Sequence, residues 1–229
     1  MTMPTAVGVK PDQGPAPAML VLAYFRPGHP HAWPRLHQTP PDLVVIDVEE
    51  GPGVARDPAL ATLVTRLLGA GIQVLGRVDT DFGLRPIEDV RADLRHYRSW
   101  YGLRGVYLDQ VASGADRLDH YREIVDGVRG TIALNPGVYP DPGYAQLADV
   151  VVTFDGPLSA YRATREPAWA RDQARGRFCH VIHDVPGHAR ESTLRRAARL
   201  AGTVAVTDRA GSAPWSDLPA YYGTPIVAG

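Results

Sequence analysis

The amino-acid sequence predicts an α/β fold, a single-domain (β/α)₈ TIM barrel, on three observations. The chain has 229 residues, a length that barrels of this type fill as one domain. Short apolar runs recur along it, and helical stretches lie between most of them. Strands that alternate with helices form parallel sheets, and eight such strands close a barrel. The alternative fold is an open doubly wound sheet, but no GxGxxG or Walker sequence follows any run, which disfavours a nucleotide-binding sheet of that kind.

The expected strands are rich in Val, Ile and Leu and mostly do not alternate with polar residues. Strands that are buried on both faces of a parallel sheet have this composition. Residues 1–18 are rich in Pro, Gly and Ala, so we expect a disordered leader there and the barrel over 19–229. The strands are expected at Met19–Tyr24, Leu43–Val48, Ile72–Asp79, Gly105–Asp109, Thr131–Asn135, Val150–Asp155, Phe178–Asp184 and Thr203–Asp208.

Helices are expected between most of these strands. Asp57 can cap a helix over Pro58–Gly69, which has Pro at its first position and Gly at its end. In Pro86–Tyr101 and Arg117–Val128, apolar residues recur at helical spacing. The proline-rich segment Pro27–Pro41 is expected to contain no regular helix. Further helices are expected at Tyr144–Leu147, Leu158–Thr164, Glu191–Leu200 and, closing the chain, Asp217–Tyr222.

The composition is that of an ordinary soluble globular protein. The net charge of −1 gives no electrostatic attraction to nucleic acids or membranes, so we expect neither as a partner. A single cysteine, Cys179, excludes an intrachain disulfide, and it lies in an apolar run as an inert thiol would. The N-terminal residues lack the features of a signal peptide and no apolar run reaches the length of a membrane span, so a cytoplasmic location is expected. The sequence leaves the oligomeric state open.

Polar residues gather where the expected strands end. In a barrel these ends converge on one rim, where such folds place their chemistry. Several of the residues also have a structural interpretation: Asp208 as a helix cap, Arg77 as half of an ion pair, and Glu49 with Glu50 as a solvated turn. The residues are Tyr24, Asp47, Glu49, Glu50, Arg77, Asp79, Asp81, Asp109, Gln110, Asn135, Thr153, Asp155, His180, His183, Asp184 and Asp208.

A metal site is not expected among these residues, nor is any cofactor. His180 and His183 lie three residues apart in a strand, so their side chains point to opposite faces and cannot jointly bind an ion. We expect His180 to pack outward and His183 to reach the pocket. The aromatic residues Tyr97, Trp100 and Tyr101 are expected to pack a helix, whereas Tyr24 and Phe82 lie at strand ends, where they can serve as sugar platforms.

Asp109 and Asp155 form the candidate catalytic pair. Both follow apolar runs, on the fourth and sixth expected strands, so their carboxylates can face one pocket. Two carboxylates across a cleft are the minimum for glycoside hydrolysis, in which one protonates the leaving oxygen and the other attacks the sugar or activates water.

The motifs of this chain resemble those of the spherulin-4-like proteins, spherulation-specific family 4. The resemblance runs from about Met19 to His183. Its landmarks are Gly51-Pro52-Gly53, Gly76-Arg77-Val78-Asp79-Thr80-Asp81-Phe82-Gly83, Trp100-Tyr101, Gly105-Val106-Tyr107-Leu108-Asp109-Gln110, Asn135-Pro136-Gly137 and Val152-Thr153-Phe154-Asp155.

The resemblance implies a (β/α)₈ barrel and microbial glycoside hydrolase activity on galactosaminogalactan-type exopolysaccharides. The family typically has Asp-Glu after the fourth strand, where this chain has Asp109 and Gln110, and Glu after the sixth, where it has Asp155. The family's Asn-Pro-Asn-Ser before Gly-Pro-Gly is replaced by Asp47-Val48-Glu49-Glu50. Glutamine donates and accepts hydrogen bonds but cannot act as a general acid or base.

These observations favour a glycoside hydrolase-like enzyme, an intracellular and repurposed relative acting on a sugar-bearing or amino-sugar substrate, such as a metabolite of a bacterial secondary pathway. Asp109 and Asp155 are the expected catalytic residues. One alternative is a cofactor-free isomerase, lyase or cyclase that uses either acid for proton transfer, and another is a catalytically inactive carbohydrate-binding protein. The expected substrate-binding residues are Tyr24, Asp47, Glu49, Arg77, Asp79, Gln110, Asn135 and His183.

Overall fold

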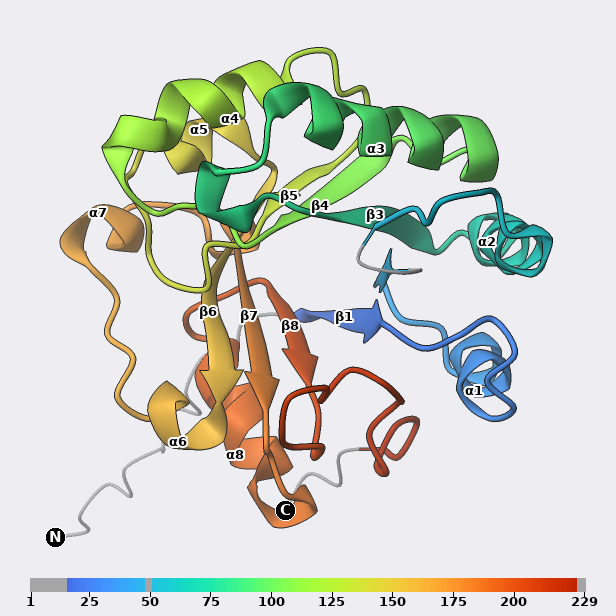
Figure 1. The fold of residues 1–229 in the computed structure, drawn as a ribbon. Helices are drawn as coiled ribbons and strands as arrows, with labels where there is room; N and C mark the ends of the chain where they lie inside the picture. Colours follow the sequence, from blue (N-terminus) through green and yellow to red (C-terminus); the bar gives the residue numbers. More distant parts are fainter. Residues whose placement is uncertain (1–15, 48–50, 226–229) are drawn as a thin grey trace, which may run out of the picture.

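The computed structural model describes residues 16–47 and 51–225 and shows a closed barrel of eight parallel strands in one domain. Each strand pairs with the next in sequence, and β1 pairs with β8 to close the ring (Figure 1). The fold predicted from the sequence is therefore confirmed. The strands are β1 (Ala18–Ala23), β2 (Leu43–Ile46), β3 (Gln73–Asp79), β4 (Gly105–Asp109), β5 (Ile132–Leu134), β6 (Val150–Pro157), β7 (Phe178–His183) and β8 (Thr203–Val206).

Most of the expected leader, residues 1–15, lies outside the described residues, as does Val48 at the expected end of the second strand. The remaining strands agree with the expected ones to within about two residues at each end. No helix in the described part of the chain is long and apolar enough to cross a membrane.

Alternate residues of each strand point into the barrel and fill its interior. The apolar cluster inside includes Leu22 of β1, Val45 of β2, Leu75 of β3 and Tyr107 of β4. These residues are linked by the strand register, in which Leu22 pairs with Val45 and Val45 with Leu75. The residues between them face outward, against the helices. Side chains alternate between the two faces of a strand, so in a regular strand the residue two positions after an interior residue also points inward, toward the mouth.

The helices surround the barrel, as Figure 1 shows. The helix predicted over Pro58–Gly69 is confirmed, and the Asp57 carboxylate caps it by accepting from the backbone N–H groups of Ala59 and Leu60. The helices are α1 (Ala32–Gln38), α2 (Pro58–Gly69), α3 (Ile87–Tyr101), α4 (Leu118–Val125), α5 (Tyr144–Leu147), α6 (Leu158–Tyr161), α7 (Ala168–Arg171) and α8 (Gly187–Ala197).

Helix α1 corrects the expectation that the proline-rich segment Pro27–Pro41 lacks a helix. Pro34 is the third residue of α1, in the first turn, where the backbone N–H has no partner within the helix. The buried side chains of Trp33 and Leu36 attach the helix to the barrel, and the Trp33 indole donates to the Arg26 carbonyl at 2.9 Å. Prolines elsewhere in the segment therefore leave room for two turns of helix.

The expected closing helix over Asp217–Tyr222 is wrong, because this segment forms turns. Pro219 has no N–H to donate. The guanidinium of Arg35 in α1 binds the carbonyls of Pro219 and Tyr222, at 3.2 and 2.9 Å, so these oxygens are engaged outside any helix. The last turns are thereby attached to α1 instead of continuing as a helix.

Helix α3 packs closely against the barrel through the aromatic residues expected to do so. A Cβ atom at Gly76 of β3 would lie 2.5 Å from the Tyr97 ring, so only glycine allows this approach. The Tyr97 hydroxyl donates to the Ile46 carbonyl at 3.3 Å, and the Tyr101 hydroxyl donates to the Pro52 carbonyl at 3.2 Å. These contacts fix α3 beside the strands that carry the polar residues of the mouth.

Candidate active site

The polar residues of the mouth belong to the inward-facing set of their strands. Tyr24 lies two residues beyond interior Leu22, Asp47 two beyond Val45, and Arg77 two beyond Leu75. The same spacing places Asp109 after Tyr107, Asn135 after Ala133 and His183 after Val181. In β6 the interior residue is Val152, and a register shift between Val152 and Phe154 changes the phase of the strand, so that Asp155 pairs with interior Val181 and faces inward three residues after Val152.

Arg77 is at the centre of the site. Its Nη1 donates to Asp47 Oδ2 at 2.8 Å, and its Nε donates to Asp109 Oδ2 at 2.6 Å. The Oδ2 of Asp79 lies 3.6 Å from Nη2, and the Tyr24 ring lies 5.2 Å from the Arg77 Cζ atom. One guanidinium therefore holds three carboxylates in fixed positions: one from the residue that follows β2 and the others from β3 and β4.

Asn135 connects the two candidate catalytic acids. Its Nδ2 donates to Asp109 Oδ1 and to Asp155 Oδ2, each at 2.8 Å. Its Oδ1 accepts from the Gly137 backbone N–H at 3.0 Å, which fixes the orientation of the amide. Since both carboxylate oxygens lie 2.8 Å from one nitrogen, they are separated by no more than twice that distance.

The two acids of this pair have different surroundings. Burial in the mouth and the nearby Asp109 raise the pKa of Asp155 to about 6, and the hydrogen bond from Asn135 opposes the rise. Asp155 still reaches solvent at the mouth, so screening by water limits the effect. Asp109 is less exposed and accepts hydrogen bonds from the guanidinium of Arg77 and the amide of Asn135.

The pKa values of Arg77 and Asp47 also differ from the ordinary values of these groups. Burial lowers the pKa of Arg77, but Tyr24 and Asp109 more than offset this and the net shift is upward, so the guanidinium stays charged. Burial raises the pKa of the Asp47 carboxyl, while Arg77 and the Gly51 backbone N–H oppose the rise. The network is thus held by a permanent cation and not by a group that titrates near neutrality.

Gln110 lies beside the acid pair in a strained conformation. Its φ is +48°, in the left-handed region that non-glycine residues rarely adopt. Its Nε2 donates to Asp79 Oδ2 at 2.7 Å, so the amide supplies the hydrogen to a carboxylate that already faces Arg77. The amide therefore positions Asp79, a role for which a carboxylate at this position would be unsuited.

A second strained turn follows β3. Asp81, Phe82 and Gly83 all have positive φ, at 45°, 51° and 80°. The Phe82 N–H donates to the Gln110 carbonyl at 2.7 Å, and the Thr80 hydroxyl contacts the same carbonyl at 2.8 Å, which joins the two strained segments. Phe82 remains 55% exposed, so a large apolar ring is held on the rim in an unfavourable backbone conformation.

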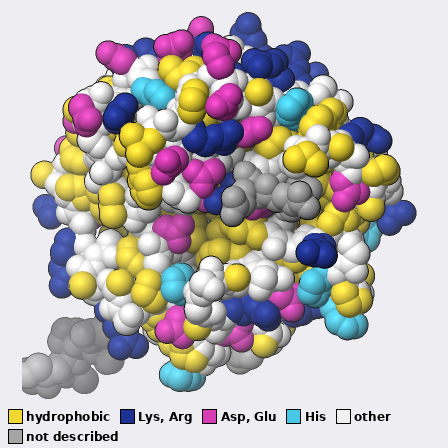
Figure 2. Space-filling model, in the orientation of Figure 1, with side chains coloured by type: hydrophobic (Ala, Val, Ile, Leu, Met, Phe, Trp, Pro, Cys, Tyr) yellow, Lys and Arg dark blue, Asp and Glu magenta, His cyan; other side chains and the backbone are white. Residues whose placement is uncertain are grey.

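Aromatic side chains border the mouth on the other side. Tyr24 packs against the apolar interior of the barrel, and so does Trp215, which lies in the turns after β8. Trp215 was not among the expected site residues, because it lies seven residues beyond Asp208, the end of the expected eighth strand, in a segment expected to precede a helix. Figure 2 shows a hollow at the centre of this face, with hydrophobic side chains on its floor and acidic ones along its edge.

The two histidines of β7 point in opposite directions, as expected. His180 is buried outside the barrel and its Nδ1 lies 2.8 Å from the Tyr161 hydroxyl. His183 faces the mouth side, where burial lowers its pKa, and its Nδ1 is buried with no hydrogen-bond partner among the described residues. Within that part of the chain, no three His, Cys, Asp or Glu side chains are grouped to hold a metal ion.

The remaining sequence-predicted residues fall outside this network. Glu49 and Glu50 lie outside the described residues. Asp208 does not cap a helix, which corrects that interpretation, since turns follow β8; its Oδ1 accepts from the Ala220 N–H at 3.1 Å. Cys179 is fully buried inside the barrel and burial raises the pKa of its thiol, as expected of an inert cysteine.

Comparison with known proteins places these features in context. The family model for spherulation-specific family 4 matches residues 18–227. The chain is 27% identical over 196 residues to Spherulin-4 of Physarum polycephalum, an alignment that covers 78% of this chain and 59% of that protein. The chain thus spans about three fifths of the length of this curated relative.

Two solved structures share the fold. The Sph3 protein of Aspergillus clavatus, in complex with GalNAc, superposes with a TM-score of 0.78 at 24% identity, covering 92% of this chain and 96% of Sph3. The ICChI chitinase of Ipomoea carnea superposes with a TM-score of 0.53 at 13% identity, covering 87% and 96%. The fold of this chain, a closed barrel of eight parallel strands, is therefore shared with both proteins.

Proposed function

Because this chain belongs to spherulation-specific family 4, we propose that it is a glycoside hydrolase-like enzyme in which Asp109 and Asp155 are the catalytic acid pair. One observation carries the proposal: a single side chain, Asn135, hydrogen-bonds both carboxylates at the mouth of the barrel. Two carboxyl groups held at this separation, in different electrostatic surroundings, are the equipment that glycosidic bond cleavage requires.

The surroundings assign a role to each acid. Asp155 has a pKa raised to about 6, so about a tenth of it carries a proton at pH 7 and most of it below pH 6, and the protonated form is the one that acts as a general acid. Asp109 lies against Arg77 and serves as the negative charge that faces the anomeric carbon. Because both oxygens of Asp109 accept hydrogen bonds, attack by Asp109 on the anomeric carbon requires Arg77 or Asn135 to release one oxygen.

The separation of the acids favours retention of configuration. Retaining enzymes hold their carboxyl groups about 5–5.5 Å apart, and inverting ones about 6.5–9.5 Å apart to admit a water molecule. The oxygens of Asp109 and Asp155 that share Asn135 are no farther apart than twice 2.8 Å. Therefore the first product released from a chiral glycoside is expected to keep the anomeric configuration of the substrate.

We propose an amino sugar as the substrate class. The Sph3 structure, which superposes with a TM-score of 0.78, contains GalNAc, and the residues at the mouth suit a sugar ring. Tyr24 and Trp215 offer apolar faces, and Asp47, Asp79 and Gln110 offer polar groups to its hydroxyls. His183, whose ring is half-buried on the mouth side, is proposed to bind a substrate oxygen.

The restriction to a small intracellular substrate, and the cytoplasmic location, stay predictions of the sequence. The chain replaces family carboxylates with Gln110 and the shorter Asp155, which fits a changed substrate. A cofactor-free isomerase, lyase or cyclase is the second candidate, favoured by the raised pKa of Asp155, which suits any proton transfer near neutrality. The short distance between the acids disfavours the third reading, a protein that only binds carbohydrate.

The test is hydrolysis of aryl glycosides and oligomers of galactosamine and N-acetylgalactosamine. Asp109→Asn and Asp155→Asn should each lower kcat/KM by about 10²–10⁴-fold. The matched control is Asp119→Asn, whose side chain is 94% exposed on α4 and pairs with Arg122 rather than with a residue of the mouth network. NMR of the first-formed product reports the configuration, and mass spectrometry with a 2-fluoro glycoside reports whether a covalent adduct forms.

Activity that survives both substitutions would overturn the acid pair. Absence of turnover on the whole panel by the folded protein would overturn the glycosidase proposal. Turnover with inverted configuration would leave the pair in place but overturn the retaining geometry.

A further inference from the structure

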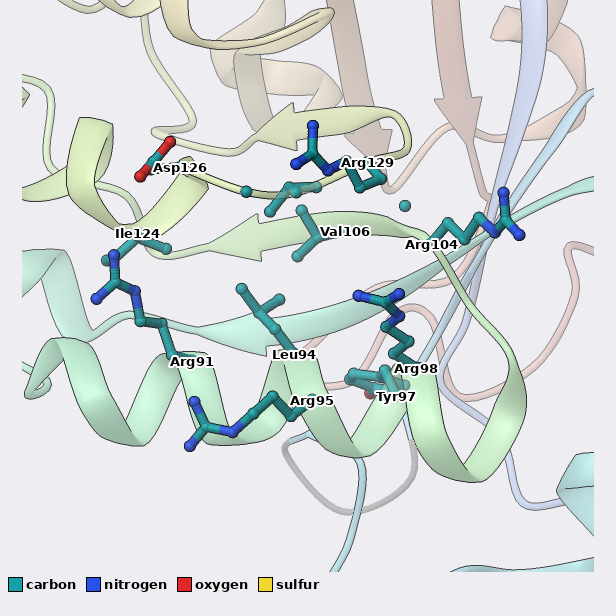
Figure 3. A pocket seen from close by; sticks show the side chains of 13 residues that line it. Arg91, Leu94, Arg95, Tyr97, Arg98, Arg104, Val106, Ile124, Asp126 and Arg129 are labelled. Carbon is teal, nitrogen blue, oxygen red and sulfur yellow. The ribbon is translucent and has the colours of Figure 1, made fainter.

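A second hollow lies at the other end of the barrel, away from the mouth. It has a volume of about 330 Å³ and lies between α3 and the segment that joins α4 to β5, over the first residues of β4. Figure 3 shows Arg91 and Arg98 reaching from α3 toward the strands, with Arg129 across from them. A hollow of this size is at the lower end of the range for small-molecule sites.

The lining of this hollow is strongly cationic. Five arginines border it, and the only acid among the lining residues is Asp126. Arg91 is compensated by Glu88 and Glu123, whose carboxylate oxygens lie 3.5 Å from its Nη1. Within the described ranges no carboxylate lies within salt-bridge distance of the other arginines, which are Arg95, Arg98, Arg104 and Arg129. The chain as a whole has a net charge of −1, so this concentration of cations is local.

The placement of the arginines on α3 is costly in the absence of an anion. Arg91, Arg95 and Arg98 follow one another at spacings of four and three residues, so they lie on one side of the helix. Like charges at these spacings destabilise a helix by about 0.2–0.5 kcal/mol per pair at low salt. A sequence that breaks a local rule in this way, beside a hollow, is typical of a binding site.

The floor of the hollow is apolar. Val106 and Ile124 are buried, and Leu94 packs against the same cluster from α3. Gly127, with φ of +83°, lies on the wall and has no atom within 4 Å of the position of a Cβ. The hollow therefore offers a flat apolar surface with guanidinium groups around its edge.

We propose that this hollow binds a small molecule that carries two or more linked phosphates and an apolar ring, the chemistry of a nucleoside diphosphate. Guanidinium groups bind phosphate oxygens through paired hydrogen bonds, and a diphosphate carries about three negative charges, against the three arginines Arg98, Arg104 and Arg129. A monocarboxylate would leave most of this charge uncompensated. The ring packs on Leu94 and Val106.

The choice of a small ligand over an acidic peptide rests on size and shape. The hollow is bounded on one side by α3 and on the other by the segment of Asp126 to Arg129, so it admits a few rings and phosphates but no folded partner. A neighbouring hollow shares Arg104 and Gly105 with this one and is lined by residues of β3. It gives room for part of a longer ligand. The proposal is independent of the activity at the mouth.

Isothermal titration calorimetry at low ionic strength tests the site, with ADP, pyrophosphate and adenosine as separate probes. ADP is expected to bind with one-to-one stoichiometry. Arg98→Gln and Arg129→Gln should each weaken ADP binding by about tenfold or more, the effect of losing a charge-assisted hydrogen bond. The matched control is Arg195→Gln, which removes an equal charge from α8, where the residue pairs with Glu191, and should leave the affinity unchanged.

Each outcome decides a part of the proposal. ADP bound more tightly than pyrophosphate, with adenosine bound weakly or not at all, supports both the cationic edge and the apolar floor. Pyrophosphate that binds as tightly as ADP overturns the apolar floor. Absence of ADP and pyrophosphate binding at millimolar concentration overturns the site, and so does binding that Arg195→Gln weakens as much as Arg98→Gln does. Thermal melting of each variant verifies that it is folded.

Discussion

Arginine side chains have opposite surroundings at the two ends of this barrel. At the mouth, Arg77 is 12% exposed and lies within 4 Å of three carboxylates, so its charge is neutralised by the chain itself. At the other end, Arg98, Arg104 and Arg129 surround a hollow, and no carboxylate of the described residues pairs with them.

The difference shows what each end is built to do. A cation enclosed by its own carboxylates holds them in position before a substrate arrives, and such preorganisation is the main way enzymes stabilise charged transition states. A set of cations with no counter-charge in the chain is complete only when an anion binds. Removing an arginine should therefore have opposite effects at the two ends.

The largest effect is expected at the mouth. Arg77→Met leaves Asp47, Asp79 and Asp109 close together without a cation, and breaking a largely buried ion pair in this way typically costs about 3–5 kcal/mol of folding free energy. Urea unfolding at pH 7 measures this loss. The matched control Arg195→Met removes an exposed pair on α8 and should cost less than about 0.5 kcal/mol.

The origin of the loss can be tested within the same network. Adding Asp47→Asn to Arg77→Met removes one of the uncompensated charges and should restore part of the stability. A loss below about 1 kcal/mol for Arg77→Met would show that the three carboxylates do not depend on this cation.

The second effect concerns pH. Asp155 acts as an acid only when protonated, and its pKa is about 6, so kcat/KM should fall about tenfold per pH unit above that value. A pH profile of kcat/KM between 4 and 9 gives the pKa of the free enzyme. A profile that stays flat through pH 6–8 would contradict the assignment of Asp155 as the acid.

The same shift has a consequence for stability. The folded pKa lies above the unfolded value near 3.8, so protonation favours the folded state, and stability is lost as pH rises through about 6. Because Asp155 reaches solvent, the effect is small, and it should be absent from the pH profile of Asp155→Asn unfolding.

Much of the fold could be predicted from the sequence, because local signals agreed with the packing. Asp57, Pro58 and Gly69 define α2 from its cap to its end, and the helix is found with those bounds. Helix α1 was missed because the proline count of Pro27–Pro41 was taken as a whole, whereas only the position of Pro34 in the first turn matters. The closing helix failed because Arg35, remote in sequence, binds the carbonyls of Pro219 and Tyr222.

The candidate site was predictable in residue type but not in connectivity. Strand-ending polar residues were expected on one rim, and the structure brings Asp47, Arg77, Asp109, Asn135 and Asp155 into one hydrogen-bonded chain there. No sequence pattern specifies which neighbouring carboxylates accept hydrogen bonds from Arg77. The uncompensated arginines and the contact of Trp215 with the barrel interior depend on tertiary packing alone.

A third prediction tests why the family carboxylate is an amide here. Gln110→Glu places a second negative charge against Asp79 Oδ2, to which the amide now donates at 2.7 Å. The loss of that hydrogen bond and the new repulsion should lower the free energy of unfolding by about 1–3 kcal/mol at pH 7. Part of it should return near pH 4, where the introduced carboxyl, with its raised pKa, becomes protonated.

The control is Gln110→Met, which removes the donor without adding a charge. It should cost about 1 kcal/mol, and the cost should not change between pH 4 and pH 7. A glutamate variant as stable as the wild type at pH 7 would show that Arg77, 3.6 Å from Asp79, can compensate the negative charge of a fourth carboxylate.

The smallest effect, and the one opposite in sign, belongs to the hollow. Arg95→Gln should raise the free energy of unfolding by about 0.2–0.5 kcal/mol at low salt, because it removes repulsion with Arg91 and Arg98 on α3 while glutamine has nearly the same helix propensity. At about 1 M salt, where charges are screened over about 3 Å, the gain should vanish.

Arg91→Gln provides the contrast: it loses the contacts to Glu88 and Glu123, so it should bring no such gain. Urea unfolding at both salt concentrations compares the two variants, and a destabilised Arg95→Gln at low salt would mean that the arginines of α3 already have counter-charges, which would remove the contrast between the two ends of the barrel.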